Sequence, residues 1–352
     1  MEPGANKPAV TLNDVALAAG VSLATASRSL NGSARKVNDT YRLRVVDAAQ
    51  RLGYIPNLFA QAVAKGTTTT VALLVADISD PYFSTIASGV IKAAESAGLV
   101  VTIAVTGRNP ERELATVRAL RGQRPRVMIL AGSRMAGSPQ EADLRKELSA
   151  FEENGGRVAF ISQNAAPFAT VLLDNHGGAR ALAESLVGLG YRRFAVVAGP
   201  PTIVTSQDRL QGFRDGLAAH GIYLAEHHIA HTDFTRDGGY QAATDLVQAG
   251  LDDVDLLFAV SDVMAMGAMS ALRDAGLEPG RDLGVAGYDD IPTVRDITPS
   301  LTTVRIPLEE VGRRALELAF GVVQGQDDAG QAGASTVPVV TEVVLRDSTP
   351  RR

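Results

Sequence analysis

From residue 71 onward, short apolar runs rich in β-branched residues alternate with longer stretches of helical periodicity, and this alternation strongly constrains the fold. The runs cover residues 71–76, 100–105, 127–130, 158–161, 170–173, 194–198, 256–260 and 284–286. The helical stretches include residues 82–97, 111–120, 179–189, 209–220, 239–249 and 263–275. Strands that alternate with helices form parallel sheets covered by helices on both faces. We therefore expect an α/β core of two lobes with doubly wound parallel sheets, and a ligand cleft outside the carboxyl ends of the strands.

The first 70 residues have a different pattern, made of short helices with clear start and stop signals. A capping box at Thr11 and Asp14 begins a helix that stops at Gly20. Ser22 begins a second helix over 23–30, and so short a connection permits only a sharp helix–turn–helix corner. Further helical patterns cover residues 39–52 and 58–64. The last is too short to be stable alone and needs a partner.

The net charge of −5 hides opposite balances in these two parts of the chain. Residues 1–70 hold eight Lys and Arg against four acidic side chains, a net +4, whereas the remainder holds 26 against 35, a net −9. A small basic unit joined to a larger acidic one indicates a polyanion-binding module attached to a domain with a different function. A solvated charged face alone would also explain the +4.

Several classes of protein are disfavoured by what the sequence lacks. With no cysteine there are no disulfides, thiolate metal sites or cysteine nucleophile, and a cytoplasmic location is the default. The N-terminus has no apolar stretch typical of a secretory signal, and no run is long enough to span a membrane. No phosphate-binding glycine loop or nucleophile elbow follows any predicted strand, so we expect no cofactor and no enzyme activity. His227, His228 and His231 would fall on two faces of a strand, so we expect no metal site.

Residues 10–32 resemble, position by position, the DNA-reading helix–turn–helix of the lactose/galactose repressor (LacI/GalR) family. Tyr-Ile-Pro-Asn at 54–57 is similar to the family's hinge entry. Four more segments match family signatures in order and spacing: RLQGF at 209–213, SDVMAMG at 261–267, GYDD at 287–290 and LTTV at 301–304. The resemblance spans nearly the whole chain. It implies a transcriptional repressor that binds a palindromic operator as a homodimer under the control of a small metabolite.

The resemblance also implies where the domains begin and end. The helix–turn–helix headpiece would cover residues 1–56, and the hinge helix and linker 57–70. The effector-binding core, similar to periplasmic binding proteins, would cover 71–352. Within it, the N-terminal lobe is expected at about 71–171 plus 301–332, and the C-terminal lobe at about 172–300 plus 333–352.

For DNA, the second helix is expected to lie in the major groove with Leu23, Ala24 and Arg28 facing base edges. Arg28 would donate to a guanine, whereas Leu23 and Ala24 offer only apolar contact. The expected phosphate contacts are Thr11, Ser22, Thr25, Ser27, Asn31, Tyr54 and Asn57. In the family, a leucine of the hinge helix wedges into the minor groove. Val63, beside Ala62, stands at the matching position here, and its shorter side chain weakens that expectation.

For the effector, the expected contacts come from loops at the carboxyl ends of the strands. Asp80, Tyr82 and Phe83 follow the first strand, and Phe234 is their counterpart in the other lobe. Aromatic faces on both sides of a cleft suit a sugar ring, with a purine or nucleoside as the alternative. The family motifs direct Arg209 and Asp289 inward as donor and acceptor, and either could instead form a structural salt bridge. Ser261 replaces a common family asparagine, which weakens the contact there.

Two other classes of protein compete with this interpretation. A solute-binding protein for a sugar would share the core and the cleft, but it needs a signal peptide and no basic headpiece. A dinucleotide-dependent oxidoreductase would need a glycine loop after the first strand, where Asp77-Ile-Ser-Asp-Pro81 stands instead.

Overall fold

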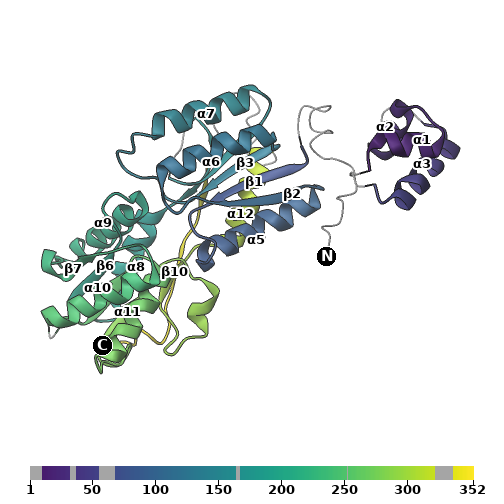
Figure 1. Cartoon of the computed structure of the whole chain (residues 1–352). Coiled ribbons are helices and arrows are strands. Elements are labelled where there is room, and N and C mark those ends of the chain that lie inside the picture. The colour runs from purple at the N-terminus through teal and green to yellow at the C-terminus, as the bar shows by residue number, and fades with distance from the viewer. Residues whose placement is uncertain (1–9, 32–36, 55–67, 164–166, 252, 322–335) are drawn as a thin grey trace, which may run out of the picture. The chain divides into compact units, whose positions relative to one another are not determined.

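The computed structural model describes residues 10–31, 37–54, 68–163, 167–251, 253–321 and 336–352 (Figure 1). They belong to two compact units, Met1–Thr68 and Thr69–Arg352. The division falls inside the linker expected at 57–70. None of the helices in the described residues is long and apolar enough to cross a membrane.

The small unit contains α1 (Leu12–Ala19), α2 (Leu23–Asn31) and α3 (Asp39–Leu52), close to the expected bounds. The capping box of α1 is confirmed, because the Thr11 side chain accepts from the amide of Asp14 while the Asp14 carboxylate accepts from the amide of Thr11. Gly20 ends α1 with φ of 64°, a left-handed conformation that a glycine adopts without strain. A core of small side chains holds the three helices together: Val15, Ala16, Ala19, Ala26, Val45, Ala48 and Ala49.

The first lobe of the large unit is built on a six-stranded parallel sheet. Its order is β11-β5-β4-β3-β1-β2, from Thr336–Val339, Ala169–Leu173, Arg157–Ser162, Val127–Ala131, Thr70–Val75 and Val100–Val105. Helices α5 (Pro81–Ser96) and α12 (Leu308–Ala319) cover one face, and α6 (Pro110–Gln123) and α7 (Glu141–Glu153) the other (Figure 1). Successive residues along a strand belong alternately to two apolar clusters, one on each face of the sheet. This alternation is what a sheet buried on both faces requires.

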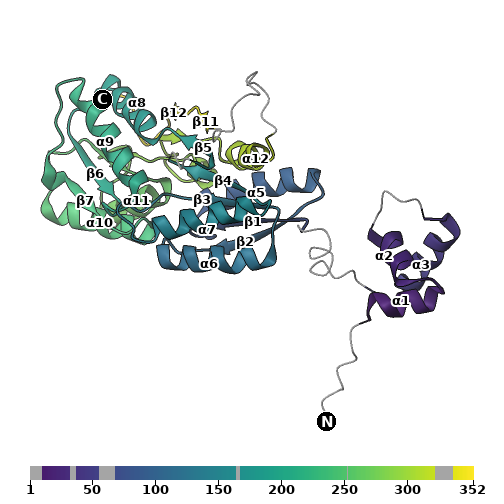
Figure 2. The ribbon, with the colours of Figure 1, turned by 90° about the horizontal axis from the view of Figure 1, so that it is seen from above.

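The second lobe has a smaller parallel sheet in the order β7-β6-β8-β9. The strands are Ile229–His231, Phe194–Ala198, Leu256–Ala259 and Gly284–Ala286. Helices α8 (Asn175–Gly188) and α9 (Val204–Ala218) lie on one face, and α10 (Arg236–Ala249) and α11 (Asp262–Asp274) on the other (Figure 2). The doubly wound two-lobed architecture expected from the sequence is therefore confirmed.

The chain passes between the lobes after β5, before α12 and after β11, and the expected lobe bounds are wrong at two of these crossings. Strand β11 was expected in the second lobe, but it pairs with β5 and completes the first sheet. Its Pro338 is tolerated because β11 is an edge strand. Strand β10 (Thr303–Arg305) was expected in the first lobe, but it pairs antiparallel with β12 (Glu342–Val344), and the adjacent Thr302 bridges to β9.

Candidate functional site

The exposed side of α2 carries the residues expected to read DNA. Leu23 is 50 % exposed and Ala24 is also exposed, whereas Ala26 is buried in the headpiece core. The Nε of Arg28 donates to the carbonyl of Ala24 at 2.9 Å, one turn back along the helix. The two terminal nitrogens of Arg28 take no part in that bond. They can donate together to O6 and N7 of a guanine.

The expected phosphate contacts are only partly described. The hydroxyls of Thr11, Ser22 and Thr25 take part in helix caps, because Thr11 bonds to Asp14 and Ser22 to Thr25. Tyr54 is half-buried against the headpiece core, and Ser27 is half-buried on α2. The side chain of Asn31, together with Asn57, Ala62 and Val63, lies outside the described residues, as does the whole segment 58–64.

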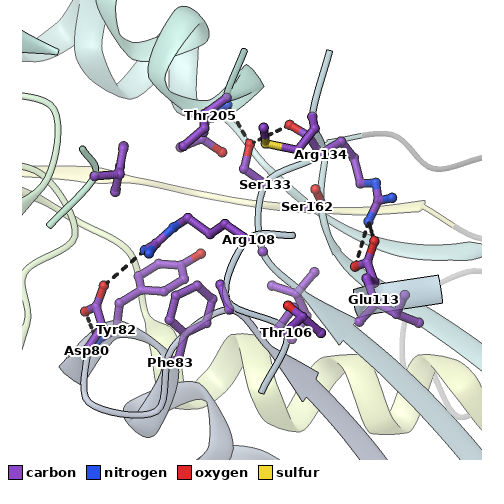
Figure 3. A pocket seen from close by; sticks show the side chains of 18 of the residues that line it. Asp80, Tyr82, Phe83, Thr106, Arg108, Glu113, Ser133, Arg134, Ser162 and Thr205 are labelled. Atoms are coloured by element: carbon purple, nitrogen blue, oxygen red, sulfur yellow. Dashed lines mark hydrogen bonds and ion pairs between the residues drawn. The ribbon is translucent and has the colours of Figure 1, made fainter. Parts of the chain in front are cut away.

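A pocket of about 940 Å³, counting its part open to solvent, lies between the two lobes of the large unit (Figure 3). Six of the seven residues expected to meet an effector line it: Asp80, Tyr82, Phe83, Arg209, Phe234 and Asp289. Their contact with a ligand stays a prediction. Ser261 is not among the lining residues, because it is 1 % exposed and its hydroxyl caps α11 by accepting from the amide of Met264.

Arg209 and Asp289 form a buried ion pair in the pocket wall. The Nη2 of Arg209 lies 2.8 Å from the Asp289 carboxylate, while Nη1 donates to the carbonyl of Val260 at 2.7 Å and Nε to Asn175 at 2.9 Å. The guanidinium also stacks on Tyr288 at 3.8 Å. Burial raises the pKa of Asp289 to about 7, and the bond to Arg209 offsets only part of that rise. Arg209 and Asp289 therefore form the structural salt bridge that the sequence analysis gave as an alternative to contact with a ligand.

Asp289 and its neighbour Asp290 both have left-handed backbone, with φ of 119° and 55°. Asp290 is not among the residues that line the pocket, and its carboxylate pairs with three arginines, Arg295, Arg305 and Arg346. These partners hold the pKa of Asp290 below its usual value despite its burial. Non-glycine residues in this conformation cost energy, and they persist where surrounding contacts hold them in place.

The structure adds Arg108, which the sequence analysis missed. Its guanidinium lies 5.9 Å from the ring of Phe83 and 5.5 Å from the ring of Phe234, so it lies against aromatic rings of both lobes. Its Nη2 is 3.8 Å from the Asp80 carboxylate, too far for a hydrogen bond (Figure 3). Burial raises the pKa of Asp80. No sequence motif surrounds Arg108, so only its place in the fold reveals it.

A second feature missed by the sequence is the arginine at the other end of the pocket. Arg134 binds both carboxylate oxygens of Glu113 at 3.0 Å (Figure 3). It also binds one carboxylate oxygen of Glu141 at 2.8 Å. Burial raises the pKa of Glu113, while the bonds from Arg134 lower that of Glu141. The buried Nε of Arg134 has no hydrogen-bond partner among the described residues.

Two of the three neighbouring histidines, His228 and His231, have different polar partners. His228 lies 3.4 Å from the carboxylate of Asp253, whereas the Nδ1 of His231 lies 3.0 Å from the carbonyl of Gly199. The ring of His227 contacts that of His228 at 4.2 Å between centroids. Within the ranges that the structure describes, no three His, Asp or Glu side chains are grouped as a metal site would require.

Comparison with known proteins agrees with this division of the chain. Residues 11–57 match the model of the bacterial regulatory proteins of the lacI family, and residues 183–349 match a periplasmic binding protein-like domain. The transcriptional regulator CelR of Thermobifida fusca is 34 % identical over 90 % of this chain and 92 % of its own. A lac repressor dimer bound to operator and an anti-inducer is 26 % identical, with a TM-score of 0.78 over 97 % of this chain and 99 % of that one. A CelR–cellobiose complex is 30 % identical, with a TM-score of 0.67 over 96 % and 99 %.

Proposed function

This chain belongs to the lacI family of bacterial regulatory proteins, and from that premise we propose that it is a repressor that binds a palindromic operator as a homodimer and responds to a neutral sugar. It is a transcription regulator and not an enzyme. The cytoplasm, where operator DNA is found, is its proposed location. The solute-binding alternative is disfavoured because such a protein has no use for a DNA-reading headpiece.

The proposal for DNA rests on the exposed face of α2. Leu23, Ala24 and the terminal nitrogens of Arg28 are the groups offered to base edges, and the helix is fixed by the small core beneath it. The lac repressor structure contains a dimer on its operator. Because a two-fold dimer reads two equivalent half-sites, we expect a palindromic site for this chain as well.

Selection of duplexes from a random library with the full chain tests this part. The expected result is an inverted repeat whose half-sites are protected together in footprinting. Salt titration should show the steep loss of affinity that phosphate contacts produce. Selected sequences without any inverted repeat would contradict binding as a two-fold dimer.

The proposal of a neutral effector rests on one observation, the charge balance of the pocket. Its lining holds three arginines and three carboxylates, and each guanidinium faces a carboxylate: Arg108 and Asp80, Arg134 and Glu113, Arg209 and Asp289. An anionic ligand would have to compete with these carboxylates, and a buried charge without a partner is costly. Uncharged hydroxyl groups can accept from the arginines and donate to the carboxylates at once.

The aromatic side chains explain why this neutral ligand should be a sugar. Tyr82 and Phe83 meet edge to face with ring centroids 4.9 Å apart, and Phe234 lines the pocket from the second lobe. The apolar faces of a sugar ring pack on such rings, while its edge hydroxyls reach the charged pairs. A similar solved structure is a complex of the transcriptional regulator CelR with cellobiose.

Thermal shift measurements test the effector class. We expect a neutral sugar such as cellobiose, galactose or ribose to raise the melting temperature, because a ligand that binds only the folded state stabilises it. Glucuronate, glucose 6-phosphate and hypoxanthine serve as anionic and purine comparisons. A shift only with an anionic sugar would refute the charge argument, and a shift only with the purine would favour the nucleobase alternative.

A further inference from the structure

The two lobes are joined across the pocket by hydrogen bonds between two loops that lie far apart in the sequence. Residues 133–136 follow β3 in the first lobe, and residues 202–205 lead into α9 in the second. Met135 and Ile203 form an antiparallel β-bridge. The amide of Ala136 donates to the carbonyl of Thr202 at 2.8 Å, and the amide of Val204 to the carbonyl of Arg134 at 3.1 Å.

Side chains reinforce this backbone bridge. The amide of Thr205 donates to the hydroxyl of Ser133 at 2.9 Å (Figure 3). Gln163, at the end of β4, donates from Nε2 to the hydroxyl of Thr205 at 2.9 Å, and its Oε1 accepts from Ser162 at 2.8 Å. The amide of Arg134, which follows β3, also donates to this Oε1 at 3.5 Å. Gln163 therefore joins the loop of the second lobe to the end of β4 and to the loop after β3.

We infer that this bridge, residues 133–136 with 202–205 and Gln163, is a latch that holds the lobes closed around the pocket before any effector arrives. The three chain crossings tether the lobes on their own, whereas the latch adds hydrogen bonds that must break when the cleft opens. Ser133, Met135, Ile203 and Thr205 also line the pocket, so an opened latch separates parts of its wall. Gln163 is a positioning residue, because it is not among the lining residues and acts through Thr205.

The latch has a regulatory consequence, which rests on the proposed function. Where a ligand binds only the closed form, its apparent affinity falls in proportion to the closed fraction. Loosening the latch should therefore weaken effector binding.

The absence of cysteine from the sequence makes a direct test possible, because an introduced pair has no competing thiol. The bonds on either side of Met135 and Ile203 make them a non-hydrogen-bonded pair, for which the Cα atoms lie about 4.5 Å apart. That separation suits a disulfide. In the full chain carrying Met135→Cys and Ile203→Cys, oxidised glutathione should join the two thiols and release two molecules of reduced glutathione, without any sugar or DNA present.

This variant is equilibrated in buffers that differ in the ratio of reduced to oxidised glutathione. The fraction of cross-linked protein in each buffer gives the effective concentration of one cysteine thiol relative to the other. Gln163→Met removes the side-chain bonds while keeping a similar volume, and we expect it to lower that concentration by about three- to tenfold. Gln211→Met is the matched control, since Gln211 on α9 bonds to Asp215 of its own helix, and it should change nothing. The latch would be refuted if the cross-link formed no more readily than a disulfide between two free thiols in solution. It would also be refuted if Gln163→Met left the effective concentration unchanged.

Sugar binding then tests the regulatory consequence. In calorimetry with the sugar that raises the melting temperature, Gln163→Met should bind about threefold or more weakly than the parent, and Gln211→Met should bind as the parent does. Equal affinities of Gln163→Met and the parent would refute this consequence. If no sugar binds at all, the proposed effector class fails, while the thiol equilibrium still decides the latch.

Discussion

Replacing Arg209 by methionine tests whether the buried ion pair in the pocket wall stabilises the core. The guanidinium is 2 % exposed, and its bond to Asp289 at 2.8 Å joins residues 80 positions apart in the sequence. Methionine has a similar length but no donor, so the Asp289 carboxylate would remain buried without its partner. Breaking a buried pair in this way costs about 3–5 kcal/mol. We expect Arg209→Met to lose about that much free energy of unfolding, in addition to any loss of effector binding.

Because the cost comes from the charge left behind, a second substitution should relieve it. Adding Asp289→Asn to Arg209→Met removes the carboxylate, and the double variant should be more stable than the sum of the single losses predicts by about 2 kcal/mol. Burial already raises the pKa of Asp289 to about 7, and losing Arg209 raises it further. The folded variant then binds a proton more readily than the unfolded chain. Below about pH 6 Asp289 is protonated in both folded proteins, so the deficit should be smallest near pH 5 and should grow as the pH rises through about 7 toward about 8.

Urea denaturation followed by circular dichroism measures these free energies at both pH values. Arg214→Met on the same helix is the matched control, because Arg214 pairs with a highly exposed Glu226 and such a pair contributes less than about 1 kcal/mol. Stability of Arg209→Met within about 1 kcal/mol of the parent, or strictly additive losses in the double variant, would refute this account of the pair.

Three further predictions concern single side chains. Arg28→Ala should cost about 1–3 kcal/mol on the selected operator and relax preference at one base of each half-site, and unchanged affinity in a binding titration would remove Arg28 from the reading surface. Gly20→Ala should destabilise the headpiece by about 1–2 kcal/mol in thermal unfolding, because φ of 64° strains alanine and its Cβ would lie 2.6 Å from the Arg44 guanidinium; an unchanged midpoint would contradict this. Phe234→Ala should weaken the bound sugar about tenfold or more in calorimetry, whereas Tyr223→Ala, 82 % exposed, should not; equal effects would place the sugar elsewhere.

The sequence by itself determined the features that short-range chemistry decides. The capping box at Thr11, the turn at Gly20 and the run of apolar residues in each central strand depend on neighbours within a few positions. Helix and strand periodicities therefore predicted the helices of the helix–turn–helix and the central strands of both lobes nearly to their bounds. The resemblance to the LacI/GalR family added the expected site residues, and six of the seven in the core lie at one pocket.

Only the tertiary structure decided which distant residues meet. Arg108 reaches Phe234 and Gln163 reaches Thr205 across the two lobes, whereas Arg134 reaches Glu113 of α6 within the first lobe. No local pattern marks such partners, because the packing of distant segments brings them together. For the same reason β11 could not be assigned to its sheet. Its pairing with β5 depends on where the chain returns and not on the propensities of its own residues.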